Sequence, residues 1–470
     1  MTEWKDWLLI ALYLGASAGF ILSLKWLSHP TTARRGVRAG ELGMAAAIVG
    51  TLLQGDIVDF RWILIAAFIG SAIGAALAIF MPMTAMPQRI AVSHAFGALA
   101  AALVGTAEFL LGRGDLDTFT AGVLGLEMLL GYLTVTGSLI AFGKLQGIVR
   151  DRAWVFRGQN LMNLGVLAAG LVVVVALTLS PSSTQLIPVL IVIGLAFGVL
   201  FVIRIGGADK PTVISLLNSF AGLSGAALGF AIGNPILILA GALDGSSGFL
   251  LSVFMCRAMN RSIVNVVFGG FGASAHAPTD VEERPVRITS AEEVAMLLDT
   301  AGLVIVVPGY GMAAAQAQHK VRELTELLGR RGTEVKFAIH PVAGRMPGHM
   351  NVLLAEANVP YDQLCDLDDV NPDFPRCDVA IVIGANDVVN PAARHDADSP
   401  IYGMPILDVD HARSVVVIKR SMRSGFSGIE NELFYAPQTM MLFGDAQKVA
   451  GDLVHEVSKL PSPVLAGAHG

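Results

Sequence analysis

The chain has 470 residues, of which 54% are hydrophobic and 15% are charged. Its mean hydropathy of +0.63 is hard to reach for a purely water-soluble protein and indicates several segments in contact with lipid. Residues 1–262 hold 16 Lys and Arg against 12 Asp and Glu, whereas residues 263–470 hold 16 against 26. The acidic second part argues against nucleic acid as a partner, because phosphate backbones require clustered basic side chains.

Nine hydrophobic runs are long enough to cross a bilayer as helices. They lie at residues 4–26, 40–55, 61–81, 88–111, 118–142, 160–180, 185–204, 211–231 and 235–256. The second run is short and the eighth is rich in Gly and Ala, so counts of eight and ten stay open. The connecting segments alternate between basic and weakly charged, which places the N-terminus outside and the residues after Arg261 in the cytoplasm. Residues 1–262 are therefore expected to form a polytopic helical bundle embedded in membrane lipid.

The C-terminal part shows a different pattern. Residues 263–288 are polar and contain proline, as in a linker, and residues 289–470 are expected to form a separate cytoplasmic domain. There, short β-rich runs alternate with amphipathic helices, which predicts a Rossmann-like parallel sheet covered by helices. Strands are predicted at Leu303–Val307, Val335–His340, Asp378–Ile383 and Ser414–Lys419, with a further candidate at Pro405–Val409. Helices are predicted at Met312–Leu328, Met350–Ala357 and Asp445–Lys459, and Ser290 with Glu293 forms a capping box.

A glycine-rich turn follows the first predicted strand. Gly309, Gly311 and Ala314 form the pattern G-x-G-x-x-A between a strand and a helix, the order that a dinucleotide site requires. Gly309 would permit the tight turn, Gly311 the approach of a pyrophosphate, and Ala314 the close packing of helix on strand. The same pattern at residues 270–275 leads into a proline instead of a helix and is interpreted as linker.

The nucleotide can also be argued from the sequence. NAD sites usually place an acidic residue at the end of the second strand, where it binds the ribose 2′-hydroxyl. Here that strand ends in His340, which favours NADP over NAD. Lys419, Arg420 and Ser421 follow a later strand and could hold a 2′-phosphate, although a solvated basic strand end explains them equally well. Residues 342–350 and 384–387 suit close contact with a ligand, but ordinary surface turns use the same residue types.

His94 is the only histidine inside a predicted span. An ionisable side chain at such depth is a functional hypothesis by default, and histidine titrates near physiological pH. Asn218 and Ser138 lie at a similar predicted depth, so the three could form a polar level that passes protons. A hydrogen bond between helices is the alternative. The lack of further histidines in the spans argues against haem electron transfer.

Four segments together resemble a known family. Residues 309–312, 340–351, 384–387 and 419–422 are similar to the NADP(H)-binding domain of the β subunit of proton-translocating NAD(P)+ transhydrogenase, and the similarity covers essentially the whole chain. The resemblance implies that NADP(H) lies across the sheet in reversed orientation, that Lys419–Ser421 hold its 2′-phosphate, and that Gly425–Leu433 closes as a lid. It also implies that His94 and Asn218 belong to a proton path.

The resemblance also implies a reaction and partners. Hydride transfer between two nicotinamides needs two nucleotide sites, and this chain holds one convincing motif. NAD(H) is therefore expected on an alpha subunit, with direct transfer between cofactors and no catalytic side chain. The enzyme would be an oxidoreductase and translocase, a dimer of the complex in a bacterial inner membrane. An NADP-sensing transporter or channel is the alternative; an NADPH-dependent membrane reductase would need a flavin, haem or metal relay that the sequence does not indicate.

The expected site residues follow from these motifs and the resemblance. No metal site is expected, because the three cysteines are scattered. Asp387 and Asp209 are expected to couple the two parts, and His94, Asn218 and Ser138 to form the proton pathway. The residues expected to contact NADP(H) are Gly309, Tyr310, Gly311, Met312, Ala314, Val342, Ala343, Gly344, Arg345, Met346, Pro347, Gly348, Gly384, Ala385, Asn386, Asp387, Lys419, Arg420, Ser421, Gly425, Phe426 and Ser427.

Overall fold

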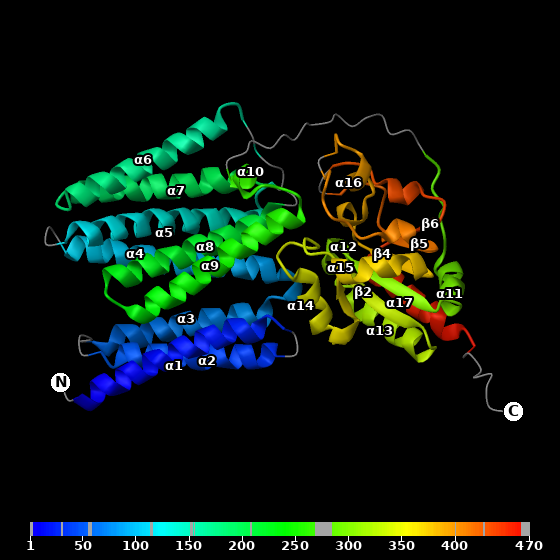
Figure 1. Cartoon of the computed structure of the whole chain (residues 1–470), viewed down its shortest axis with the longest axis horizontal. Coiled ribbons are helices and arrows are strands. Elements are labelled where there is room, and N and C mark those ends of the chain that lie inside the picture. Colours follow the sequence, from blue (N-terminus) through cyan, green and yellow to red (C-terminus); the bar gives the residue numbers. More distant parts are fainter. Residues whose placement is uncertain are drawn as a thin grey trace. The chain divides into compact units, whose positions relative to one another are not determined.

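The computed structural model of the chain describes residues 3–29, 32–54, 59–112, 116–150, 154, 156–206, 209–267, 284–399, 401–425 and 428–461. The chain forms two compact units, one of residues 1–205 with 213–251 and one of residues 206–212 with 252–470. The first unit is built of long helices, and the second contains a parallel α/β domain (Figure 1). The predicted fold class is confirmed. Most of the predicted linker lies outside the described residues.

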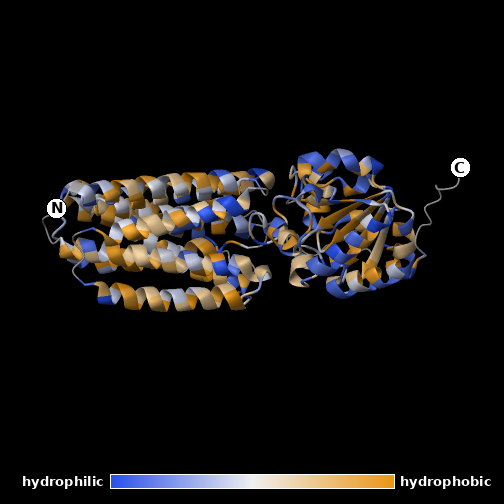
Figure 2. Ribbon diagram, turned by 90° about the horizontal axis from the view of Figure 1, so that it is seen from below, coloured by the Kyte–Doolittle hydropathy of each residue, from blue (hydrophilic) through white to orange (hydrophobic). Residues whose placement is uncertain are grey.

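Nine long helices lie in the described residues before position 260. They are α1 (Glu3–Leu27), α2 (Ala33–Leu52), α3 (Phe60–Phe80), α4 (Met86–Leu111), α5 (Thr118–Leu145), α6 (Gln159–Leu179), α7 (Ile187–Ile203), α8 (Lys210–Ala231) and α9 (Pro235–Ala258). Within those ranges, eight are long and apolar enough to cross a membrane. The exception is α2, which carries four charged residues in its first nine positions and begins well before the predicted run at 40–55. Figure 2 shows hydrophobic residues along the length of these helices.

Helix α5 is the most enclosed of these helices. Its side chains pack with those of α4, α6 and α7 in a core that includes Phe109, Leu124, Met128 and Leu190, all nearly inaccessible to solvent. Small residues bring the helix axes close together. A Cβ at Gly198 of α7, for example, would lie 2.1 Å from the carbonyl oxygen of Leu133 on α5. Close backbone packing of this kind is how helices associate where lipid removes the hydrophobic driving force.

Helices α8 and α9 form a second tight contact. A Cβ at Gly222 would lie 2.3 Å from the backbone nitrogen of Gly245, so the two helices meet backbone to backbone. Two serines of α8 add hydrogen bonds across this seam. The Ser219 hydroxyl donates to the carbonyl of Gly245 at 2.7 Å, and that of Ser215 donates to the carbonyl of Gly248 at 2.9 Å. The relative position of side chains along the seam is therefore closely fixed.

The α/β domain is built on one sheet whose strands are all parallel. Its strands are β1 (Leu303–Pro308), β2 (Glu334–Ile339), β3 (Leu364–Asp366), β4 (Val379–Ile383), β5 (Ser414–Lys419) and β6 (Thr439–Phe443), in the spatial order β3-β2-β1-β4-β5-β6. This is the doubly wound order, and the direction of winding reverses between β1 and β4. Strands β1 and β4 are buried along their whole length, as expected for a sheet covered on both faces.

Helices and short helical turns cover the sheet. The amphipathic helices α11 (Ala291–Asp299), α13 (Gln318–Arg330) and α17 (Ala446–Lys459) pack against one another. A separate core joins side chains of β1, β4 and β5 to α15 (Leu367–Val370) and to the 3-10 helices η5 (Asn371–Arg376), η7 (Val409–His411) and η8 (Glu432–Tyr435). The predicted capping box is confirmed, because the Glu293 backbone N–H donates to the Ser290 hydroxyl at 3.2 Å.

The structure differs from the predicted elements in its strands and in one helix. The four main predicted strands are present, but β3 and β6 were not predicted. The predicted helix 312–328 is broken into α12 (Tyr310–Ala314) and α13, because Gln316 between them has φ +52°. Ala314 is exposed, and Met312 and Ala313 are buried instead, so the expected packing role of Ala314 is wrong.

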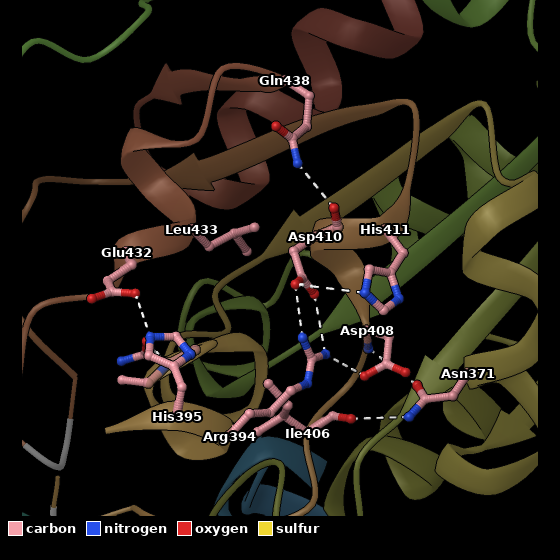
Figure 3. A network of polar contacts seen from close by, with 12 residues as sticks. Asn371, Arg394, His395, Ile406, Asp408, Asp410, His411, Glu432, Leu433 and Gln438 are labelled. Atoms are coloured by element: carbon pink, nitrogen blue, oxygen red, sulfur yellow. Dashed lines mark hydrogen bonds and ion pairs between the residues drawn. The ribbon is translucent and has the colours of Figure 1, made fainter. Parts of the chain in front are cut away.

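The predicted strand at 405–409 is also wrong, because its backbone groups bond to side chains and loops. Asn371 donates to the carbonyl of Ile406 at 3.0 Å and accepts the N–H of Asp408 at 3.1 Å (Figure 3). Arg394 of α16 (Ala392–His395) forms ion pairs with the carboxylates of Asp408 and Asp410. The segment is thus fixed by a polar network beside the sheet, without strand pairing.

Candidate functional site

The turns that follow β1 and β4 interlock at the point where the winding reverses. The N–H of Gly311 donates to the carbonyl of Gly384 at 2.9 Å. Gly384 has φ +69°, and a Cβ there would lie 2.3 Å from the backbone nitrogen of Met312. A Cβ at Gly309 would lie 2.4 Å from the Cα of Ala385. All three glycines are required by the contact of one turn with the other.

This contact changes the explanation of Gly311. The sequence suggested that Gly311 lets a pyrophosphate approach the backbone, whereas a Cβ there would lie 2.6 Å from the Cα of Gly384. The glycine is therefore needed for packing within the protein itself. The two turns remain at the carboxyl ends of β1 and β4, the place where open α/β sheets bind ligands.

His340, just after β2, links the loop that follows this strand to the segment at Pro405 by hydrogen bonds. Its Nδ1 accepts the N–H of Val342 at 3.2 Å, so Nε2 carries the proton and donates to the carbonyl of Pro405 at 2.7 Å. Burial lowers the pKa of His340 to about 4, against the opposing effect of the Pro405 carbonyl. The imidazole is neutral near pH 7, and both of its nitrogens are used within the protein.

The loop after β2 meets the turn after β1 in a small polar cluster. Gly344 has φ +110° and leaves room for His349, whose Nδ1 accepts the N–H of Arg345 at 3.0 Å. The guanidinium carbon of Arg345 lies 4.1 Å from the ring centroid of Tyr310. Burial, and then the charge of Arg345, lowers the pKa of His349 to about 4.

One ring nitrogen of this cluster has no partner in the part of the chain that the structure describes. His349 accepts at Nδ1, so its Nε2 carries a hydrogen, and that buried nitrogen has no hydrogen-bond partner among the described residues. Of the other loop residues expected to contact a nucleotide, Ala343 and Met346 are buried, whereas Val342, Pro347 and Gly348 are partly or fully exposed. Arg345, which is partly exposed, is therefore better placed to meet a ligand than Ala343 or Met346.

The three polar residues at the end of β5 have different surroundings. Lys419 is half-buried, with Nζ donating to the carbonyl of Arg423 at 2.6 Å and lying 4.5 Å from the ring centroid of Phe434. Burial lowers the pKa of Lys419 to about 8, and the negative charge of Asp387 opposes this effect. Arg420 and Ser421 are exposed. An anion that binds at the carboxyl end of β5 could contact Arg420 and Ser421 directly, because both are exposed.

The segment of residues 428–433 lies against the loop after β4. The side-chain amide of Asn431 donates to the carbonyl of Asn386 at 2.9 Å, and that of Asn390 donates to the carbonyl of Glu430 at 3.0 Å. His395 and Glu432 add a contact of 2.9 Å between their side chains (Figure 3). Phe426 and Ser427, both expected to bind nucleotide, lie outside the described residues.

Gly425 lies next to Asp387, the predicted coupling residue. A Cβ at Gly425 would lie 2.7 Å from Oδ1 of Asp387 and 2.4 Å from Nδ2 of Asn386. That Asn386 nitrogen is buried and has no hydrogen-bond partner among the described residues. Asn390 and Asn431, both almost completely buried, were not anticipated, because nothing in the sequence separates a buried loop asparagine from an exposed one.

In the helical unit, the structure brings two of the three predicted proton-path residues together. His94 on α4 interacts with the side chain of Asn218 on α8, and its Nδ1 is buried with no hydrogen-bond partner among the described residues. Each lies eight residues from the first residue of its helix, about 12 Å along the axis. Asn218 also donates from Nδ2 to Oδ1 of Asp244 on α9 at 3.0 Å, a contact the sequence did not predict. Ser138 is buried on α5, and its hydroxyl has no partner among the described residues.

Two other carboxylates have defined partners. Asp209, just before α8, accepts from Arg261 at 2.9 Å in an ion pair in which the aspartate is almost completely buried. Glu127 of α5 is fully buried and accepts the hydroxyl of Ser224 at 3.0 Å. Among the described residues, no group of three or more His, Cys, Asp and Glu could hold a metal ion.

Membrane-capable helices joined to a doubly wound parallel sheet define a polytopic membrane protein with a dinucleotide-fold domain. The family model described as NAD(P) transhydrogenase beta subunit matches residues 9–456. Two curated relatives named NAD(P) transhydrogenase subunit beta, from Rhodospirillum rubrum and from one strain of that species, are each 50% identical over 461 residues, 96% of this chain and 99% of theirs. The chain belongs to the NAD(P) transhydrogenase beta subunit family.

Proposed function

We propose that this chain is the membrane-embedded, NADP(H)-binding subunit of a proton-translocating transhydrogenase. The observation that carries the nucleotide assignment is the pair of exposed polar residues, Arg420 and Ser421, beside Lys419 at the carboxyl end of β5. Cations and a hydroxyl at that edge suit a 2′-phosphate, and β2 ends in the internally bonded His340 with no carboxylate for a 2′-hydroxyl.

The donors at the sheet edge fit a nicotinamide dinucleotide phosphate. His349 Nε2 and Asn386 Nδ2 are buried nitrogens that lack a partner among the described residues, on the loops after β2 and β4. Buried donors are rarely left unused, so a polar ligand at these loops would satisfy both. Arg345 would add charge on the β2 side, and Arg420 with Ser421 would hold the 2′-phosphate. The lid residues from Gly425 to Leu433 would cover the bound nucleotide.

The chain's own residues have a positioning role in the reaction. The nicotinamide supplies the hydride chemistry when bound, so no acid, base or nucleophile is needed at the sheet edge. The interlocked turns at Gly309 and Gly384 provide a rigid floor, and Asn390 and Asn431 hold the lid segment against the loop that carries Asp387. A closed lid would exclude water from the reacting atoms. An alpha subunit would carry NAD(H) and complete the second site.

Coupling to protons is assigned to the helical unit. His94 would take up and release the proton, with Asn218 as its partner, and Ser138 would belong to the same path. Asp387, which interacts with Lys419, and Asp209, which pairs with Arg261, would relay the change to the nucleotide domain. The two protonation states must then bind NADP(H) with different affinity. The N-terminus would lie outside and residues 289–470 in the cytoplasm of a bacterium, as the alternating basic segments favour, and the family resemblance implies a dimeric complex in the inner membrane.

Binding selectivity tests the proposal. Arg420→Ala removes a charge-assisted contact to phosphate and should weaken NADP binding by about 10- to 100-fold, leaving NAD binding unchanged. Arg330→Ala is the matched control, because this arginine is exposed in the last turn of α13. It lies just before the amino end of β2, whereas the candidate site lies at the carboxyl ends of the strands. Isothermal titration of the purified chain with NADP and with NAD gives the ratio. Equal weakening for both nucleotides, or none for either, would contradict the assignment.

A further inference from the structure

A carboxylate lies in the middle of the last long helix. Asp244 is nine residues from the first residue of α9 and fourteen from the last, about 14 Å and 21 Å along the axis. The helix is otherwise apolar enough to cross a membrane. Burying a carboxyl group at such depth in a membrane costs free energy. Such a group usually faces polar side chains or water in a functional path.

Asp244 extends the contact between His94 and Asn218 by one residue. The side-chain amide of Asn218 lies close enough to His94 to interact with the imidazole, and it donates from Nδ2 to Oδ1 of Asp244 at 3.0 Å. Three polar side chains from α4, α8 and α9 therefore form one continuous chain, with the amide in the centre. The order is imidazole, amide, carboxyl.

The seam between α8 and α9 fixes the position of the amide. Ser215 and Ser219, on either side of Asn218, donate to the carbonyls of Gly248 and Gly245 on α9. A Cβ at Gly248 would lie 2.9 Å from Nδ2 of Asn218, so the amide occupies space that this glycine leaves open. Asn218 cannot move along α9 without breaking these contacts. Its remaining freedom is rotation of the amide group.

The direction of the amide depends on the carboxyl group. An ionised carboxylate only accepts hydrogen bonds, so it turns the NH₂ group of Asn218 toward α9 and leaves the amide oxygen to accept an N–H of His94. A protonated carboxyl can donate to the amide oxygen, and the NH₂ group then faces a ring nitrogen that carries no proton. The second arrangement requires a neutral imidazole, whereas the first also accommodates the protonated ring. The covalent N–H bonds of the Asn218 amide stay intact, so the amide does not itself carry the proton. Protons would reach the imidazole and the carboxyl group through water.

We propose that Asp244 is a positioning residue of the proton path, which sets the orientation of Asn218 and thereby selects the form of His94 that is hydrogen-bonded. This role rests on the proposed proton path through His94 and Asn218. The orientation of Asn218 depends on the carboxyl group of Asp244. A side chain of the same shape, or the contact between the helices alone, would not set it.

The test uses the complex with its alpha subunit, reconstituted in lipid vesicles. NADPH-driven reduction of an NAD analogue is followed together with the internal pH. Asp244→Asn preserves the shape and one hydrogen bond, yet we expect it to slow proton movement and coupled reduction about tenfold. Asp244→Glu should restore most of both rates. Ser247→Ala is the matched control on the same helix, since among the described residues its hydroxyl bonds only to the backbone carbonyl of Asp244, and it should leave both rates unchanged.

NADP binding, measured in parallel, shows that each variant is folded. Normal rates in Asp244→Asn, together with loss of proton movement in His94→Ala, would overturn the role of Asp244 and leave the proposed function intact. Equal losses in Asp244→Asn and Asp244→Glu would also overturn it, because a carboxyl group at this position would then not restore proton movement. Unchanged proton movement in His94→Ala would overturn the proposed proton path itself. If Asp244→Asn does not assemble, Asp244→Ser replaces it with the same expected results.

Discussion

Replacing Gly384 by alanine tests the interlocked turns directly. The residue has φ +69°, and a left-handed conformation costs an alanine about 1–2 kcal/mol. The new Cβ would lie 2.3 Å from the backbone nitrogen of Met312, which cannot move aside as a flexible side chain could. Overlap in a packed region typically costs about 1–3 kcal/mol. The free energy of unfolding of the α/β domain should therefore fall by about 2–5 kcal/mol.

Gly332→Ala separates the two contributions to this loss. Gly332 has φ +93°, but nothing lies within 4 Å of a Cβ built there. Only the conformational cost applies, and the lower entropy of the unfolded alanine chain offsets part of it, so the expected loss is about 1 kcal/mol. Both variants keep the same chemical change, Gly to Ala, in the same domain.

Hydrogen exchange of the full-length chain measures both losses. Exchange of the amides in β1 and β4 reports the local free energy of opening, and NADP titration reports the state of the site. Gly384→Ala should open these strands and abolish NADP binding, whereas Gly332→Ala should leave binding unchanged. Equal exchange rates in the two variants would refute the claim that the turns are locked backbone to backbone.

Three further changes test other parts of the account. His340 and His349 have pKa values near 4 when folded and about 6.5 when unfolded, so stability present above pH 6.5 should be lost as the pH falls toward 4, by about 3 kcal/mol for each histidine. His349→Gln should remove about half of that loss in hydrogen exchange corrected for pH, and an unchanged loss would contradict the assignment. Burial lowers the pKa of Lys419 to about 8, so titrations from pH 7 to pH 9 should show NADP affinity falling relative to NAD as its charge disappears; a constant ratio would count against a phosphate contact. Lys144→Met should lower the thermal midpoint of the detergent-solubilised chain, because its ammonium donates to the carbonyls of Val202, Ile203 and Ile205 where α7 ends, and an unchanged midpoint would show that those carbonyls find other donors.

Much of the fold was predictable because its elements have strong local signals. The strands β1, β4 and β5 are largely continuous apolar runs, and the capping box at Ser290 is a local pattern that the structure confirms. Strand β3 has only three residues and lies at the edge of the sheet, so it gives no periodic signal. The segment 405–409 has the composition of a strand, but its hydrogen-bonding partners are Asn371 and a loop far away in sequence.

The candidate site was predictable as a set of loops and less so as a set of contacts. The G-x-G-x-x-A motif located the turn after β1, but it could not show that Gly311 packs against Gly384, 73 positions later. The burial of Ala313 in place of Ala314 follows from the break at Gln316, where a non-glycine residue has positive φ. Asp244 was visible as a carboxylate in a span, but its bond to Asn218 depends on how α8 and α9 pack.

Proton movement during hydride transfer is the most direct measurement of the central claim. The complex of this chain with its alpha subunit would be sealed in vesicles, supplied with NADPH and an NAD analogue, and monitored for reduction and internal pH together. If protons move through His94, we expect the internal pH to change in step with reduction. His94→Ala should stop this change although NADP still binds. Reduction without any change in internal pH, or a change that persists in His94→Ala, would contradict it.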